Sequence, residues 1–97
     1  MEYAGGIDDV CAISLLPASQ LKRPVGFDSK HAFECESVIQ WLTRCRATHP
    51  LTGQVFAPQP VASLLHPLAV NGCIEHLAET QRMLNNAGHV IGSVSLV

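Results

Sequence analysis

The residue types best suited to metal binding gather between residues 31 and 54 of this 97-residue chain. His31 and Cys35 form one candidate pair, Cys45 and His49 form another, and three residues separate the members of each pair. Structural zinc takes four Cys or His ligands, usually supplied as closely spaced pairs, and one helical turn can serve this spacing. A small structural zinc-binding domain is therefore one interpretation of this stretch.

Two features of the same stretch argue against a zinc site. The sequence contains no Cys-x-x-Cys pair. Val38, Leu42 and Cys45 follow the i, i+4, i+7 spacing of one helix face, so the thiol of Cys45 is expected to face the core. The same orientation argues against a nucleophilic thiol–imidazole pair of Cys45 and His49. We therefore expect neither a metal ion nor another cofactor.

Composition and charge exclude several classes of protein. Hydrophobic residues make up 47% of the chain and the net charge is −2, which is typical of one globular domain and not of a disordered segment. Without a basic cluster, nucleic acid is not an expected partner. No stretch approaches the ~20 apolar residues that span a bilayer, so no membrane is expected. The acidic N-terminus does not resemble a signal peptide, and four cysteines then indicate reduced thiols in a cytoplasm.

Local patterns predict the elements that position these residues. Short strands are expected on either side of a turn at Asp28–Lys30, and a helix is expected from Cys35 to about Arg46. A second helix is expected from Pro67 to about Leu84, because proline suits the first helical position. Residues 10–17 are expected to form an ordered loop, and residues 56–65 a loop or a short helical turn. The domain is expected at 8–86, between a flexible arm at 1–7 and a tail at 87–97.

The order of five short segments resembles the U-box, a zinc-free relative of the RING finger found in ubiquitin ligases. These segments are DDVCAISL, RPV, FECESVIQWL, HPLTG and LLHPLAVNGCI, and together they cover most of the chain. The resemblance implies an α+β fold with two loops, a short β-hairpin, a central helix and a C-terminal helix. The HPLTG loop is also similar to that of U-box-like effectors of the NleG type, which pathogenic bacteria secrete; such a protein would act in the host cytosol.

The resemblance also explains the missing zinc ligands. The eight ligand positions of a RING finger would fall here on one cysteine and on residues that mostly form hydrogen bonds instead. The first site would be Cys11, Ser14, Glu34 and Ser37, and the second would be Ser29, His31, His49 and Thr52. In a U-box, hydrogen bonds hold the two loops where the metals would be. We therefore expect two small polar clusters, one for each site.

In the U-box family, the two loops and the central helix form a shallow apolar groove. The groove binds a ubiquitin-conjugating enzyme charged with ubiquitin, and the ligase positions the thioester for transfer to a protein substrate without a covalent intermediate. The resemblance therefore implies no catalytic residue. The groove residues that it implies here are Ile13, Leu15, Trp41, Pro50, Leu51 and Gln54.

The sequence departs from the family at several positions. Gly53 and Gln54 lie where a basic residue often clamps ubiquitin, and Gln54 lacks the charge and the planar donor group of an arginine. Leu68 stands where an asparagine that braces the loops is common, and the segment between Pro50 and Pro67 is longer than usual. A non-catalytic interaction module of the same fold therefore remains an alternative, as does a small zinc-binding domain.

Overall fold

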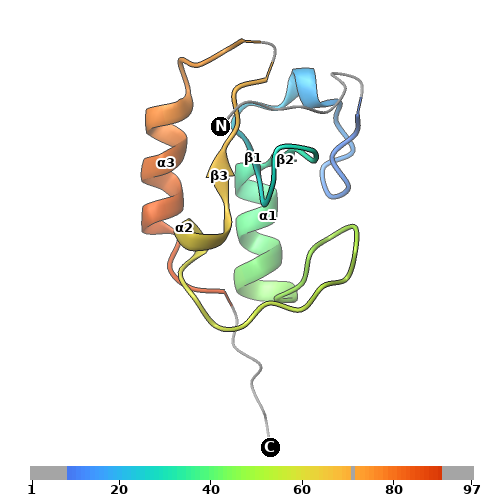
Figure 1. The fold of residues 1–97 in the computed structure, drawn as a ribbon, viewed down its shortest axis with the longest axis vertical. Coiled ribbons are helices and arrows are strands. Elements are labelled where there is room, and N and C mark those ends of the chain that lie inside the picture. The colour runs from blue at the N-terminus through green and yellow to red at the C-terminus, as the bar shows by residue number, and fades with distance from the viewer. Residues whose placement is uncertain (1–8, 71, 91–97) are drawn as a thin grey trace, which may run out of the picture.

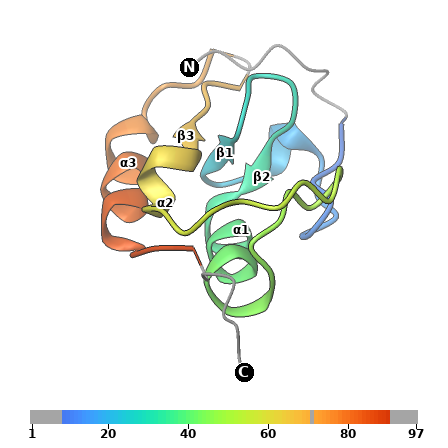
Figure 2. The same cartoon turned by 60° about the horizontal axis from the view of Figure 1, so that its bottom comes forward.

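A three-stranded antiparallel sheet and the helices around it form the molecule, whose computed structural model describes residues 9–70 and 72–90 (Figures 1 and 2). The strands β1 (Pro24–Gly26), β2 (Phe33–Glu34) and β3 (His66–Pro67) lie in the order β2-β1-β3. The helices are η1 (Ala18–Gln20), α1 (Cys35–Gln40), its continuation η2 (Trp41–Cys45), α2 (Val61–Leu64) and α3 (Leu77–Asn86). The α+β class, the short hairpin, the central helix and the C-terminal helix are therefore confirmed.

The hairpin between β1 and β2 turns at the predicted residues. The Asp28 carboxylate accepts hydrogen bonds from the backbone N–H groups of Lys30, at 2.8 Å, and His31, at 3.1 Å. Such a side-chain-to-backbone turn is a common role of aspartate. Gly26 ends β1, and a Cβ atom there would lie 2.5 Å from the His31 carbonyl oxygen, so only glycine fits at this close approach.

The central helix widens at its second half, which changes the face that its last residues present. η2 is a π-helix, and the Arg46 N–H donates to the carbonyl oxygen of Trp41, five residues earlier, at 2.8 Å. A wider turn rotates later residues off the face set by the ordinary helical period. Leu42 is therefore buried while Cys45 is exposed, and the expectation that Cys45 faces the core was wrong.

The second predicted helix begins ten residues later than expected, at Leu77 and not at Pro67. Pro67 lies instead in β3, opposite Val25, and the next residue, Leu68, donates its N–H to the Pro24 carbonyl oxygen at 2.9 Å. β3 is an edge strand of the sheet, a position that tolerates the missing N–H of proline. Pairing with β1 therefore places Pro67 in a strand, and this long-range contact cannot be predicted from the residues next to Pro67 in the sequence.

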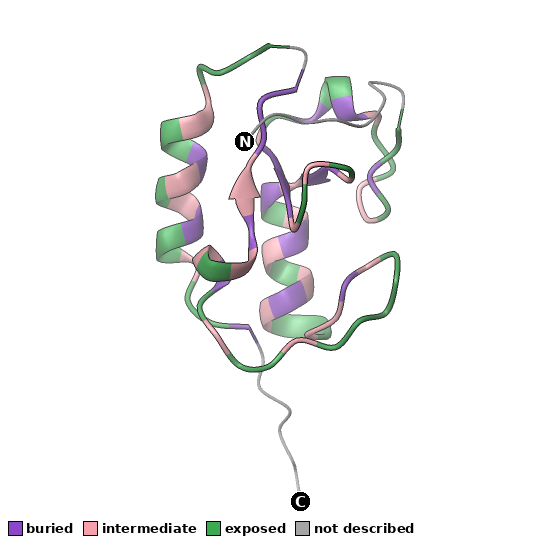
Figure 3. Cartoon of the chain, viewed as in Figure 1, coloured by how far each residue is buried: buried purple, intermediate pink, exposed green. Residues whose placement is uncertain are grey.

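The hydrophobic core lies between the sheet and the helices (Figure 3). Its largest fully buried apolar side chains come from β2, the central helix, the β3 region and α3: Phe33, Leu42, Leu65, Leu68 and Leu84. Val90 is also buried, and its N–H donates to the Gln59 carbonyl oxygen at 2.9 Å, so the chain stays packed beyond the expected domain boundary at 86. The expected arm and residues 91–97 of the expected tail lie outside the described residues.

None of the helices in the described ranges is long and apolar enough to cross a membrane.

Candidate functional site

The first loop, residues 11–16, is closed by two backbone hydrogen bonds. The Cys11 N–H donates to the Leu16 carbonyl oxygen, and the Leu15 N–H donates to the Cys11 carbonyl oxygen, both at 2.9 Å. Leu15 has a φ of 61° and is 73% exposed. The left-handed conformation costs an L-residue about 1–2 kcal/mol. The loop thus holds a large apolar side chain in solvent and in a strained backbone conformation, a combination found at binding sites.

The second loop, residues 48–55, is closed in a similar way. The His49 N–H donates to the Gln54 carbonyl oxygen at 2.8 Å, and the Gly53 N–H donates to the His49 carbonyl oxygen at 2.9 Å. Gly53 has a φ of 77°, which glycine adopts without steric cost. The loop exposes Leu51 and Val55, which are 51% and 72% accessible. It therefore presents apolar side chains from a defined backbone, as the first loop does.

Trp41 connects the second loop to the central helix. Its indole N–H donates to the Thr48 carbonyl oxygen at 2.8 Å, and its ring is half-buried against the core. A tryptophan with one apolar face and one hydrogen-bonding tip suits such a junction. The position of the second loop therefore depends on this side chain.

The two loops come from distant parts of the sequence and lie side by side at one edge of the molecule in both ribbon views (Figures 1 and 2). We call the exposed apolar residues that they carry, Leu15, Leu16, Leu51 and Val55, the two-loop surface. Among the other expected groove residues, Ile13 packs partly against the core, Pro50 is half-buried, and Gln54 is exposed. Sequence reasoning missed Leu16 and Val55, because a single leucine or valine in a loop is equally typical of a core anchor.

Three of the four residues of the first expected polar cluster, Ser14, Glu34 and Ser37, line one cavity of about 320 Å³. The Glu34 carboxylate accepts the backbone N–H groups of Lys22, at 2.8 Å, and Arg23, at 3.2 Å. The Ser14 hydroxyl is buried without a hydrogen-bond partner in the described ranges, and no side-chain hydrogen bond of Ser37 is formed there. Glu34 thus braces the segment before β1, and in the described ranges the cluster members are joined to one another only through the contact of Ser14 with Cys11.

Cys11, the remaining member of this cluster, is fully buried. Its sulfur accepts the backbone N–H of Ser14 at 3.4 Å, which stabilises the turn of the first loop. Cys35 lies at the start of α1 and is also fully buried. Burial raises the pKa of the Cys35 thiol to about 12, so this thiol stays protonated and unreactive.

The second expected cluster is built from aromatic rings more than from hydrogen bonds. The His49 ring lies 4.8 Å from the ring of Phe27 and 5.8 Å from that of Phe33, and His31 meets it edge-on at 5.9 Å. The Ser29 side chain makes no hydrogen bond in the described ranges. The expected polar residues thus lie among aromatic side chains, which the hairpin brings to this position.

His49 still fixes the second loop through its own ring. Its Nδ1 accepts the backbone N–H groups of Leu51, at 3.1 Å, and Thr52, at 3.3 Å, so the proton of the neutral ring must be on Nε2. Burial lowers the pKa of His49 below its usual range, the neighbouring His31 lowers it further, and Asp28 opposes the shift. The Thr52 hydroxyl oxygen accepts the Gln54 N–H at 3.3 Å within the same loop.

Cys45 and His49 form no thiol–imidazole contact in the described ranges, since Cys45 is exposed and His49 is buried among aromatic rings. Within residues 9–70 and 72–90, no three His, Cys, Asp or Glu side chains are grouped so that they could hold a metal ion.

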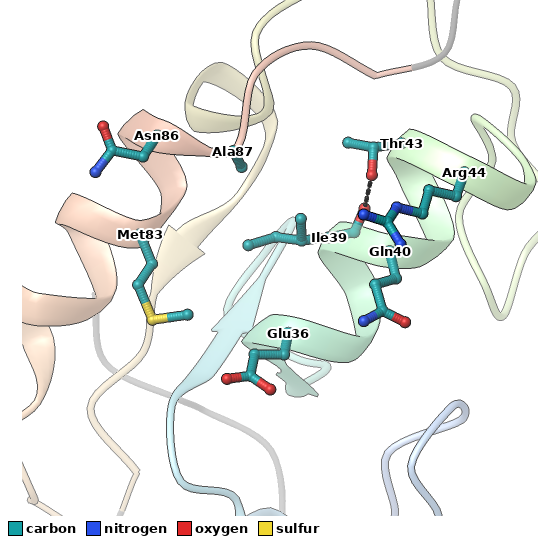
Figure 4. A pocket seen from close by; sticks show the side chains of 8 residues that line it. All are labelled: Glu36, Ile39, Gln40, Thr43, Arg44, Met83, Asn86 and Ala87. Atoms are coloured by element: carbon teal, nitrogen blue, oxygen red, sulfur yellow. Dashed lines mark hydrogen bonds between the residues drawn. The ribbon is translucent and has the colours of Figure 1, made fainter.

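A further cavity of about 450 Å³ lies between the central helix and α3 (Figure 4). Its lining mixes polar and apolar side chains: Glu36, Ile39, Gln40, Thr43, Arg44, Met83, Asn86 and Ala87. The Thr43 hydroxyl donates to the Ile39 carbonyl oxygen at 2.7 Å within the helix. None of the expected groove residues lines this cavity, so it is separate from the two-loop surface.

Comparisons of the chain with protein-family models, with curated proteins and with solved structures find no match.

Proposed function

We propose that this chain is a ubiquitin ligase module that binds a ubiquitin-charged conjugating enzyme on the two-loop surface. The observation that supports this function best is that Leu15 and Leu51 belong to two neighbouring loops, each closed by backbone hydrogen bonds, and that both side chains are more than half exposed. Apolar side chains that are held together in solvent are typical of protein interaction sites. The U-box-like order of segments is the reason for proposing a ubiquitin-conjugating enzyme as the partner.

In this mechanism the module accelerates transfer by holding the ubiquitin thioester in a reactive arrangement, so it needs no nucleophile of its own. Trp41 positions the second loop through its bond to Thr48, while Ile13 packs partly against the core and Pro50 is half-buried. Gln54 is exposed beside this surface and offers a neutral hydrogen-bond donor to ubiquitin. The proposal includes a protein substrate and a cytoplasmic location, which would be the host cytosol for a secreted effector of the NleG type.

The test is a discharge assay with a panel of ubiquitin-conjugating enzymes, each loaded with ubiquitin and mixed with the purified protein. We expect faster discharge with at least one enzyme of the panel, and loss of that acceleration in the L15A and L51A variants. Ile74 provides the matched control, because it is 62% exposed and lies on the segment before α3, so I74A should retain the acceleration. No acceleration across the whole panel would contradict the ligase function.

A second candidate function is a non-catalytic module that binds a conjugating enzyme without stimulating transfer. The composition of the second loop favours it: residues 48–55 contain no lysine or arginine, and the Gln54 side chain cannot supply a charge. Nuclear magnetic resonance titration separates the two functions. Shifts confined to the two loops, together with an unchanged discharge rate, would support the binding module.

A further inference from the structure

Cys73 and His76 form a thiol–imidazole pair just before and at the N-cap of α3, away from both loops. The Cys73 sulfur lies 3.7 Å from Nδ1 of His76, and Nε2 of the same ring lies 3.0 Å from the Leu68 carbonyl oxygen. Cys73 is exposed, whereas His76 is partly buried. The pair therefore combines an accessible thiol with an imidazole whose second ring nitrogen is hydrogen-bonded to the backbone.

The Leu68 carbonyl determines which ring nitrogen carries the proton. A carbonyl oxygen can only accept a hydrogen bond, so Nε2 of His76 must be the donor. The neutral ring then has an unprotonated Nδ1, and this nitrogen is the one that faces the thiol. The arrangement of nucleophile, base and orienting group is that of activated cysteines.

The orienting carbonyl belongs to a rigid part of the fold. Leu68 is fully buried, and its N–H donates to the Pro24 carbonyl oxygen of β1 at 2.9 Å. His76 is fixed along the chain as well, because its own carbonyl oxygen accepts the Thr80 N–H in the first turn of α3 at 2.9 Å. The imidazole is thus held between the sheet and the start of a helix.

The pair borders a cavity that can hold a small molecule. The cavity has a volume of about 180 Å³, and its lining includes Cys73 and His76 together with Ser19, from η1, and Lys22, just after it. Lys22 is the charged side chain among the lining residues. A small anion in this cavity would therefore be favoured electrostatically by the Lys22 ammonium group.

We propose that Cys73 is a nucleophilic thiol that exchanges with small disulfides carrying a carboxylate. The thiol proton passes to Nδ1 of His76, the thiolate attacks one sulfur of the disulfide, and a mixed disulfide forms on Cys73. The second sulfur leaves as a thiolate and takes the proton back from the imidazolium. One sulfur–sulfur bond breaks and one forms, so the disulfide is the only oxidant required.

The chain contains its own control, because Cys45 is the other exposed thiol and no histidine contact of its sulfur is found in the described ranges. The C45S variant leaves Cys73 as the exposed thiol, and C73S leaves Cys45. The probe is dithiobis-nitrobenzoate, a disulfide with two carboxylates, whose released thiolate is measured by absorbance. We expect Cys73 to react at least about tenfold faster than Cys45, a threshold that lies below the roughly 10²–10⁴-fold contribution of a positioned base.

Two further variants test the roles of the neighbours in the C45S background. H76N removes the base but keeps a good N-cap residue, and it should reduce the Cys73 rate to that of Cys45. K22Q should slow the reaction with dithiobis-nitrobenzoate and leave unchanged the reaction with dithiodipyridine, a neutral disulfide.

Equal rates at Cys73 and Cys45 in the otherwise native protein would overturn the assignment of a nucleophilic thiol without depending on the folding of H76N. Equal effects of K22Q on both probes would overturn the assignment of the disulfide class. This inference stands independently of the ubiquitin ligase function, because no residue of the two-loop surface takes part.

Discussion

Replacing Leu15 by asparagine separates the effect of this residue on the stability of the fold from its effect on binding. Leu15 adopts a φ of 61°, where an L-residue costs about 1–2 kcal/mol, and asparagine adopts this conformation more readily. The side chain is 73% exposed, so about 0.5 kcal/mol of apolar burial is lost from a full value of about 1.5–3 kcal/mol. The net stabilisation is therefore about 0.5–1 kcal/mol.

Under the proposed function, the same substitution should weaken binding of the conjugating enzyme. Covering the exposed 73% of the leucine side chain contributes about 1–2 kcal/mol, which corresponds to a roughly 5–30-fold higher Kd in the variant. The stabilisation corresponds to a rise in Tm of about 2–8 °C for a domain of this size. L15N should thus be more stable and less able to bind.

Thermal unfolding followed by circular dichroism gives the first quantity, and nuclear magnetic resonance titration with the conjugating enzyme gives the second. I74N is the matched control, since Ile74 is 62% exposed, has no positive φ and lies outside the two-loop surface. A drop of several degrees in the Tm of L15N would refute the strain argument. An unchanged Kd would refute the placement of Leu15 in the binding surface.

Three other predictions concern the supports of the loops and the hairpin. The free energy of unfolding should be largest above about pH 6.5 and should fall as the pH drops through the lowered pKa of folded His49, because the unfolded chain binds that proton more readily. Urea denaturation at a series of pH values measures this dependence, and the H49F variant should show a weaker one. W41F removes the donor to the Thr48 carbonyl, so it should cost about 1 kcal/mol and increase amide hydrogen exchange in the second loop; unchanged exchange would show that the bond does not hold the loop. The G26A variant should fail to fold or have a much lower Tm, because its Cβ would lie 2.5 Å from a backbone oxygen. In G53A the added Cβ meets no atom within 4 Å, so this variant should lose only about 1 kcal/mol through backbone strain. Thermal unfolding followed by circular dichroism compares the two variants, and equal effects would contradict the steric argument.

Local sequence patterns predicted the parts of the fold whose partners are close along the chain. The turn at Asp28–Lys30 formed as expected because the aspartate side chain bonds the next backbone groups directly. The helix from Cys35 formed because its apolar residues share one face, and a short α2 formed within the expected 56–65 segment. These elements depend on neighbours within a few residues, so their sequences were sufficient.

Longer-range contacts decided the positions where the sequence was misleading. Pro67 is as suitable for the start of a helix as for an edge strand, and its pairing with β1 is what places it in a strand. Periodicity placed Cys45 in the core, but a single wide turn at its helix end moved it to the surface. His49 was predicted to be a polar brace, and its aromatic neighbours come from the hairpin, which no local pattern connects to it.

The sequence by itself thus determined the hairpin turn and the central helix, because turn chemistry and hydrophobic periodicity act over short distances; the α+β class and the two loops were expected from the U-box resemblance. Only the tertiary structure decided which loop residues are exposed together, as Leu15 and Leu51 are, and which cysteine meets a histidine. The Cys73–His76 pair depends on a carbonyl in the strand region before it, and the two-loop surface depends on loops more than thirty residues apart. Such sites are defined by the packing of separate segments, which the order of residues encodes only through the whole fold.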